Sequence, residues 1–214
     1  SAPIIYGSFS TNVDMRTGSP AFGTPEYIRS TIAGGQLARF YGFPYRSSNT
    51  NASNSIDAQA IYESGMSLWA TIMSHANLVN HAAGWLEGGL TASFEKLIID
   101  AEMLQTISES LKPIEVNAYN LGVETIESVG PGGHFFDTDQ TMKHYSTEFY
   151  TPMISDWENF ENWEKNGSIT TLERANKTWK TLLKQYEQPA LDPSINEALT
   201  AFVVKRKEEI NNSR

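Results

Sequence analysis

The fold is decided by the stretch Asn77-Leu78-Val79-Asn80-His81, which continues into Ala82-Ala83-Gly84-Trp85-Leu86-Glu87-Gly88-Gly89-Leu90. The first five residues predict a short strand, and the glycine-containing residues after them predict a long loop. An amphipathic helix follows, capped by Thr91 or Ser93 and ended by Pro113. This unit of strand, long loop and helix occurs three times in the first half of the chain.

The two earlier units have the same order. Pro3–Tyr6 predicts a strand that opens into small polar residues and precedes a helix over about 24–41. Phe43–Arg46 predicts the second strand, which opens into the asparagine- and serine-rich segment 47–55 and precedes a helix over about 56–74. Such alternation predicts an α/β fold with a parallel sheet and right-handed crossovers. Sites in these folds form at the carboxyl ends of strands, so the three loops should share one face.

The chain after Pro113 is predicted to be helical. Two helices are expected over about 116–129 and 138–149. A third should begin at the capping box of Thr170 and Glu173, and a fourth at Asp192. We therefore predict two regions, an α/β part over residues 1–113 and a mainly helical region over 114–214 that packs on it.

Three strands cannot close a barrel, and they leave two exposed sheet edges, which promote aggregation. Either further strands belong to the same protein or the chain pairs with a copy of itself. The sequence therefore resembles the C-terminal portion of a larger α/β protein, and we expect a homo-oligomer.

The composition narrows the class of protein. The 214 residues include 40% hydrophobic and 19% charged residues, which is typical of a globular protein. No apolar run reaches the roughly 20 residues of a membrane helix, and no basic segment begins the chain, so we expect neither a membrane protein nor a secretory signal. The chain has no cysteine, which excludes disulfides and thiolate chemistry and suggests the cytoplasm. A net charge of −9 without a basic stripe makes nucleic acid an unexpected partner.

Candidate site residues gather in the loops that follow the predicted strands. His81 could be a general base, a hydrogen-bond donor, a metal ligand or a structural histidine at a strand end. Glu87 could act as an acid–base group, hold a cation, or bond to backbone amides near the helix. The rings of Tyr6, Phe9, Tyr45 and Trp85 could bind a quaternary ammonium group by cation–π attraction, or could be ordinary core. The polar segment 47–55, which includes Asn49, could line a pocket, although an ordinary loop is favoured.

The sequence lacks the motifs of several common types of functional site. No two histidines have metal-ligand spacing, so we predict no metal. The Gly130-Pro131-Gly132-Gly133 turn lacks the Lys-Ser/Thr ending of a phosphate loop, and no Gly-x-Ser-x-Gly elbow occurs.

At this point the chain resembles the C-terminal half of the trimethylamine:corrinoid methyltransferase family, in its branch without pyrrolysine. The resemblance covers nearly the whole chain. Its most specific stretches are Gly18–Glu26, Tyr45–Asn49, Asp57–Ala60, His81–Leu90, Gly133–Asp139, Ser155–Trp157 and Glu173–Asn176.

The resemblance implies a TIM-type (β/α)8 barrel, of which residues 1–113 would be the C-terminal strand–helix units and residues 114–214 a helical extension. It implies methyl transfer from a methylated amine to the cobalt of a separate corrinoid (cobalamin-carrying) protein. Members that use trimethylamine carry pyrrolysine, which is proposed to activate the amine, and this chain has none. A quaternary amine already carries its positive charge and needs no such activation, which favours a substrate such as glycine betaine.

In this interpretation His81 and Glu87 orient polar parts of the substrate, while Phe9, Tyr45 and Trp85 contact its trimethylammonium head. Asn49 belongs to the same expected substrate-binding set. The alternatives are a non-catalytic module that binds quaternary ammonium, an inactive fragment of the barrel, and a barrel lyase or demethylase that uses the same pocket.

Overall fold

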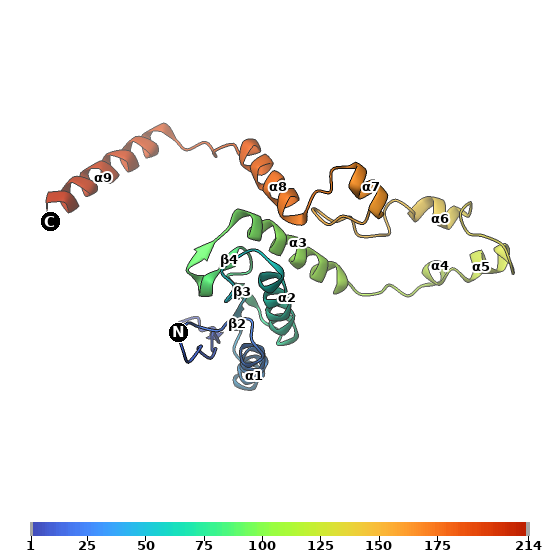
Figure 1. Ribbon diagram of the computed structural model, residues 1–214, viewed down its shortest axis with the longest axis horizontal. Coiled ribbons are helices and arrows are strands. Elements are labelled where there is room, and N and C mark those ends of the chain that lie inside the picture. The colour runs from blue at the N-terminus through green and yellow to red at the C-terminus, as the bar shows by residue number, and fades with distance from the viewer. Residues whose placement is uncertain (1, 213–214) are drawn as a thin grey trace. The chain divides into compact units, whose positions relative to one another are not determined.

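The computed structural model describes residues 2–212. The chain divides into two compact units, Ser1–Lys180 and Thr181–Arg214. The first unit contains a parallel sheet of strands β1 (Tyr6–Gly7), β2 (Tyr45–Ser48) and β3 (Leu78–Asn80), in the order β1-β2-β3. Figure 1 labels β2 and β3 of this sheet. The three predicted parallel strands are confirmed, although each is shifted or shortened by one to three residues.

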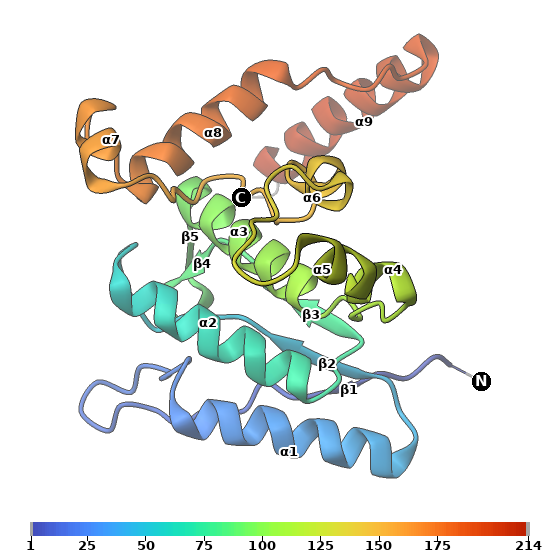
Figure 2. The same cartoon turned by 90° about the vertical axis from the view of Figure 1, so that its right-hand side faces the viewer.

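Two helices cover one face of this sheet. Helix α1 (Pro25–Tyr41) begins after Thr24, whose side chain accepts from the Tyr27 N–H, and ends at Gly42 with φ of 71°. Helix α2 (Ala58–Met73) begins after Asp57, whose carboxylate accepts from two backbone N–H groups. Both helices contact β2 and each other, and Figure 2 shows them running beside the strands. The predicted helices and their caps are confirmed.

The layer between the sheet and these helices contains many hydroxyl groups. Tyr45 lies under α1 and donates from its hydroxyl to the Thr31 carbonyl at 2.8 Å. The Tyr27 hydroxyl donates to the Ser48 carbonyl at 2.7 Å. Because buried hydroxyl groups need partners, these bonds fix the position of the helices on the strands more specifically than apolar contact alone would.

Helix α3 (Phe94–Ser110) begins after Ser93, one of the two predicted caps, which accepts from the Lys96 N–H. The loop before α3 is more ordered than the sequence indicated. Strands β4 (Trp85–Leu86) and β5 (Thr91–Ala92) pair antiparallel there, around the short 3-10 helix η1 (Glu87–Gly89). Gly88 and Gly89 have φ of 65° and 92°, so they allow the tight reversal that turns this loop into a hairpin.

The helical region differs from its prediction in three places. The expected helix over 116–129 is broken at Gly122, whose φ of 62° separates α4 (Ala118–Leu121) from α5 (Val123–Val129). Helix α6 (Asp139–His144) is shorter than the predicted 138–149, and α7 (Phe160–Lys165) was not predicted.

The last two helices match their predicted starts. Helix α8 (Thr171–Gln185) begins with the expected capping box, because Thr170 N–H donates to Glu173 and Glu173 N–H donates to the Thr170 hydroxyl. Helix α9 (Pro193–Asn212) follows Asp192, whose carboxylate accepts from the Ser194 N–H.

Two carboxylates on α3 attach the later segments of the first unit. Glu102 accepts from the N–H groups of Met153 and Ile154 and from the hydroxyls of Tyr150 and Ser155. Glu95 accepts from Asn176 at 2.6 Å and from the indole N–H of Trp179 at 2.8 Å. The division of the chain near Pro113 stays a prediction.

The fold is mixed α/β with a small parallel sheet. The three strands form an open sheet, and residues 2–212 do not close a barrel. None of the described helices is both long and apolar enough to span a bilayer.

The contact between Gly35 of α1 and Ser74 at the end of α2 tests this packing. A methyl group on Gly35 would collide with the backbone carbonyl oxygen of Ser74, whereas a methyl group on Gly65 of α2 would lie 3.8 Å from the Met103 sulfur. We expect Gly35→Ala to lower the free energy of unfolding by about 1–3 kcal/mol or more through overpacking. Gly65→Ala should raise it by about 0.5–1 kcal/mol, because alanine loses less backbone entropy in a helix. Urea denaturation of both variants checks this, and equal effects would contradict the packing.

The second prediction concerns acid stability. Two hydrogen bonds lower the pKa of Glu95 from its usual 4.5 to about 2. The bond from Asn176 has the larger effect and the bond from Trp179 the smaller one. A carboxyl whose pKa is lower in the folded state stabilises the fold above its unfolded pKa, and this stability is lost as pH falls from about 4.5 toward 2. Stability should therefore fall less steeply in that window for Glu95→Gln than for the unmodified chain. Urea denaturation across this pH range measures the slopes, with Glu161→Gln on exposed α7 as the control expected to match the unmodified chain.

Candidate functional site

The ends of the three parallel strands come together as the sequence predicted. The imidazole Nδ1 of His81, just after β3, lies 3.0 Å from the hydroxyl of Ser48 at the end of β2. The amide nitrogen of Asn49 donates to the Ala82 carbonyl at 3.0 Å. The ring of Phe9, from the loop after β1, lies 5.8 Å from that of His81. Residues from all three loops therefore form one local site.

Three of the predicted site residues, Phe9, His81 and Trp85, lie together with Phe22. These four residues are called the aromatic cluster. The His81 ring meets Trp85 edge to face at 5.1 Å, and Phe9 lies 4.6 Å from Phe22. Phe22 is buried and Phe9 is 41% exposed, while His81 and Trp85 are half-buried. The cluster thus presents ring surfaces to solvent at the strand ends, where a cationic ligand could reach them.

The backbone at both expected catalytic residues is unusual. His81 has φ of 52° and Glu87 has φ of 54°, which places two residues other than glycine in the left-handed region. Such residues carry about 1–3 kcal/mol of strain each and gather at functional sites. The observation supports a functional role for this segment without assigning a reaction to it.

Glu87 lies away from the cluster's hydrogen bonds. Its side chain is exposed, and its carboxylate accepts from the Thr91 hydroxyl at 2.6 Å across the β4–β5 hairpin. Its backbone N–H donates to the Ser53 carbonyl at 2.9 Å. A catalytic role for Glu87 stays a prediction.

Tyr45 points away from the strand-end loops. It is 2% exposed, and its hydroxyl donates a hydrogen bond to the Thr31 carbonyl of α1. The neighbouring ring is Tyr6, at 6.2 Å. Its expected role as a substrate contact stays a prediction that this placement does not favour.

Asn49 is fully buried and incompletely bonded. Its amide nitrogen has a partner, but its Oδ1 has no hydrogen-bond donor among the described residues. A buried amide oxygen without a donor is destabilising unless water or a ligand pairs with it. Asn49 therefore stays in the proposed site.

The segment around Asn49 is no ordinary loop. Residues 47–51 are buried, and Glu63 of α2 accepts from the N–H groups of Ala52 and Ser53 at 2.9 and 3.0 Å. Asn51 donates from its side chain to the Ala60 carbonyl and accepts from the Ser64 hydroxyl. The polar residues thus form a buried, hydrogen-bonded loop that supports the site, and a pocket lined by this segment stays a prediction.

The sequence did not indicate Phe22 as a site residue, and it included Ser48 and Thr50 only as members of the polar segment 47–55. Ser48 shares its hydroxyl hydrogen bonds between Thr50, at 3.1 Å, and His81. Phe22 completes the ring cluster from a turn before α1. No signal in the sequence could have placed Ser48 beside His81, because the face of β2 that it occupies depends on how the helices pack.

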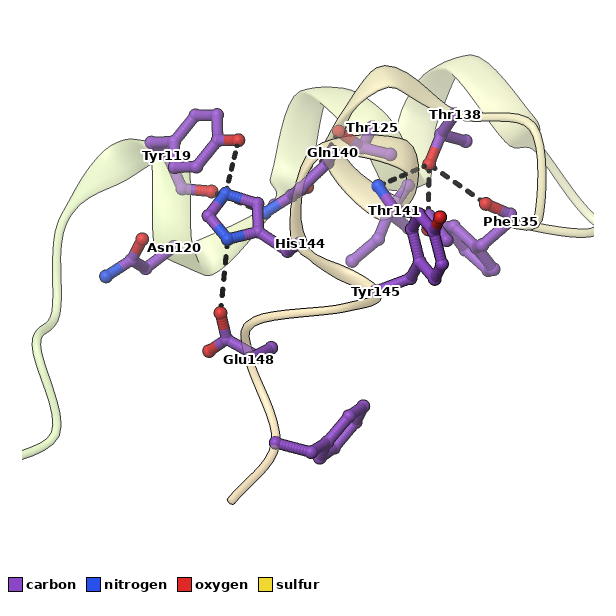
Figure 3. A pocket seen from close by; sticks show the side chains of 13 residues that line it. Tyr119, Asn120, Thr125, Phe135, Thr138, Gln140, Thr141, His144, Tyr145 and Glu148 are labelled. Carbon is purple, nitrogen blue, oxygen red and sulfur yellow. Dashed lines mark hydrogen bonds and ion pairs between the residues drawn. The ribbon is translucent and has the colours of Figure 1, made fainter. Parts of the chain in front are cut away.

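A separate cavity lies in the helical region. It has a volume of about 520 Å³ and is lined by residues of α4, α5 and α6 and their flanking turns (Figure 3). Its polar centre is His144, whose Nε2 lies 2.9 Å from the Tyr119 hydroxyl and whose Nδ1 lies 3.2 Å from Glu148. It contains none of the six predicted site residues.

No metal centre is evident in this geometry. Within residues 2–212, no group of three or more His, Cys, Asp or Glu side chains is arranged to hold a metal ion.

Comparison with known proteins decides the family. A family model described as trimethylamine methyltransferase (MTTB) matches residues 1–211. The chain belongs to the trimethylamine methyltransferase family.

Curated relatives share this assignment. A glycine betaine methyltransferase of Desulfitobacterium hafniense (strain Y51) is 42% identical over 209 residues, which are 97% of this chain and 43% of the relative. The trimethylamine methyltransferase MttB2 of Methanosarcina mazei is 32% identical over 95% of this chain and 41% of its own length. The trimethylamine methyltransferase MttB of D. hafniense (strain DSM 10664 / DCB-2) is 30% identical over 100% of this chain and 43% of its own length. The chain therefore spans less than half the length of these family members.

A buried ion pair supports the loop that carries Trp85. Lys96 and Asp100 of α3 are both fully buried and lie 2.5 Å apart, and the ammonium also donates to Ser64. The other Asp100 oxygen accepts from the Gly84 N–H at 2.9 Å. Burial lowers the pKa of Lys96, and the Asp100 carboxylate opposes this shift. The pair fixes the start of the β4–β5 hairpin in this family member.

Breaking this pair should be costly. Lys96→Met leaves Asp100 as an uncompensated buried charge, so we expect a loss of about 3–5 kcal/mol in the free energy of unfolding. Lys96→Met combined with Asp100→Asn should recover part of that loss, because Asn keeps an acceptor for Gly84 and removes the charge. The matched control is Lys112→Met, which breaks an exposed pair with Glu109 and should cost at most about 1 kcal/mol. Urea denaturation checks all three, and similar losses for Lys96→Met and Lys112→Met would contradict the buried-charge argument.

Proposed function

We propose that the protein carrying this chain transfers a methyl group from a quaternary ammonium compound, such as glycine betaine, to the cobalt of a separate corrinoid protein. The observation that carries this proposal is the aromatic cluster at the strand ends, with Phe9, His81 and Trp85 open to solvent on one side. Family membership and the relative named glycine betaine methyltransferase support this reaction class.

We place this site in a TIM-type barrel. Residues 1–113 would supply its C-terminal strand–helix units, and residues 114–214 the helical extension. The order β1-β2-β3 supports this, because β1 and β3 are edge strands to which further parallel strands could add. A homo-oligomer remains part of the proposal.

The chemistry suits a site without a covalent helper. A reduced corrinoid supplies a cobalt nucleophile that accepts the methyl group. As the new carbon–cobalt bond forms, the carbon–nitrogen bond breaks and nitrogen keeps its electron pair, so the leaving group is a neutral tertiary amine. The protein's contribution is to hold the ammonium, orient one methyl group outward and exclude water. The corrinoid stays on its partner protein, and we expect this reaction to take place in the cytoplasm.

The site residues divide this work. Phe9 and Trp85 offer ring faces to the ammonium head, with about 0.5–2 kcal/mol expected from each cation–π contact. His81, held through Nδ1 by Ser48, leaves Nε2 for a polar part of the substrate. The Oδ1 of Asn49 has no donor among the described residues, so it is available to a donor group of the ligand. Glu87 would orient substrate only if the hairpin turned its carboxylate from Thr91 toward the cluster.

The second candidate is a non-catalytic module that binds quaternary ammonium. The same aromatic cluster favours it, because cation binding needs the rings and not a corrinoid partner.

A pair of measurements separates the two functions. Transfer from glycine betaine to cob(I)alamin is followed by the absorbance of the corrinoid, and glycine betaine binding is followed by calorimetry. We expect transfer by the protein that carries this chain, and at least about a ten-fold loss of kcat/KM for Trp85→Ala and His81→Ala. Phe40→Ala, on the exposed face of α1, is the control and should be unchanged. Binding without transfer would support the module, and unchanged transfer by His81→Ala would remove His81 from the mechanism.

A further inference from the structure

We propose that Arg46 binds the carboxylate of the substrate, so that the site selects betaines over quaternary ammonium compounds without a carboxylate. This inference rests on the proposed function, because it names the substrate class of the same site.

Arg46 lies on the face of the sheet that the helices leave open. Its neighbours on either side of it in β2, Tyr45 and Ser47, face the helices, since Tyr45 bonds to α1 and Ser47 accepts from Thr71 of α2. Side chains alternate along a strand, so Arg46 and Ser48 share the opposite face. The parallel register places Gly7 of β1 and Leu78 of β3 beside Arg46 on that face.

The guanidinium group lies across β1. A Cβ atom on Gly7 would lie 3.4 Å from Nε of Arg46 and 3.8 Å from its Cζ, so the side chain passes directly over this glycine. The missing side chain at Gly7 leaves room for the guanidinium to lie against the sheet instead of extending away from it.

The guanidinium has no counter-ion in the part of the chain that the structure describes. Its Nε is shielded from solvent and has no acceptor among these residues. Arg174 and Arg206, by contrast, each lie within ion-pair distance of a carboxylate. A buried donor without an acceptor is destabilising. Because the planar guanidinium fork matches a carboxylate, an anionic group is its natural partner.

The separation from the aromatic cluster suits a short zwitterion. Ser48 lies two residues after Arg46 in β2, about 7 Å along the strand, and its hydroxyl bonds to His81. A betaine carries its carboxylate only a few bonds from its ammonium. With the ammonium at the rings of Phe9, His81 and Trp85, the carboxylate can extend along β2 toward Arg46, and a methyl group is left at the strand ends.

The test compares two ligands with the same trimethylammonium head, glycine betaine and choline. Calorimetry on the protein that carries this chain gives the ratio of their dissociation constants. We expect glycine betaine to bind at least about ten-fold more tightly. Arg46→Gln should abolish this preference by weakening glycine betaine alone. Arg46→Lys keeps the charge but loses the planar fork, so it should give an intermediate ratio. Arg29→Gln, on the exposed side of α1, makes the same charge change and should leave the ratio unchanged.

The outcomes separate this inference from the proposed function. Equal affinity for the two ligands in the unmodified protein overturns the inference. An equal loss of affinity for both ligands in Arg46→Gln also overturns it, because the Arg46 guanidinium would then pair with a carboxylate of the protein and not with the substrate. If Arg46→Gln does not fold, the ratio of the glycine betaine and choline dissociation constants in the unmodified protein and in Arg46→Lys tests the inference. Betaine-selective binding without methyl transfer to cob(I)alamin would overturn the proposed function and leave the role of Arg46 standing.

Discussion

Buried polar groups need hydrogen-bond partners, and in the segment after β2 the arrangement of the site depends on this constraint. Glu63 of α2 satisfies the N–H groups of Ala52 and Ser53. The carbonyls of Asn51 and Ser53 then accept from Gly88 and Glu87 of the hairpin. Leaving a buried polar group unpaired destabilises a fold more than a hydrogen bond stabilises it. Few other arrangements of α2, this segment and the hairpin would therefore be stable.

The parts of the fold that local sequence determines were predicted well. A threonine before a proline started α1, Gly42 ended it, and Thr170 with Glu173 started α8. These signals lie within one helical turn, so they can be interpreted without knowing the fold. The β4–β5 hairpin and the break at Gly122 were missed, because a glycine in a sequence does not reveal whether it adopts positive φ. The burial of residues 47–51 was missed because their partners lie 9 to 33 residues away.

The candidate site shows the same division. Strand ends in a parallel sheet converge, so Phe9, Asn49, His81 and Trp85 could be assigned to one region before any contact was known. Tyr45 was grouped with them because it is aromatic and near a strand end. Which face of β2 it occupies depends on the helices, and the strand Tyr45-Arg46-Ser47-Ser48 gives no apolar alternation that would decide it. For the same reason the sequence gave no weight to Arg46.

The attachment of the hairpin has a consequence for how such a site can change. Glu87 and Gly88 are held to the segment below them through backbone N–H groups and backbone carbonyls. These bonds do not depend on which side chain stands at position 87, whereas the φ of 65° at position 88 favours glycine. A lineage could therefore exchange the side chain at position 87 and acquire a different ligand preference while the scaffold keeps its shape. The hairpin would then be the adaptable part of a rigid frame.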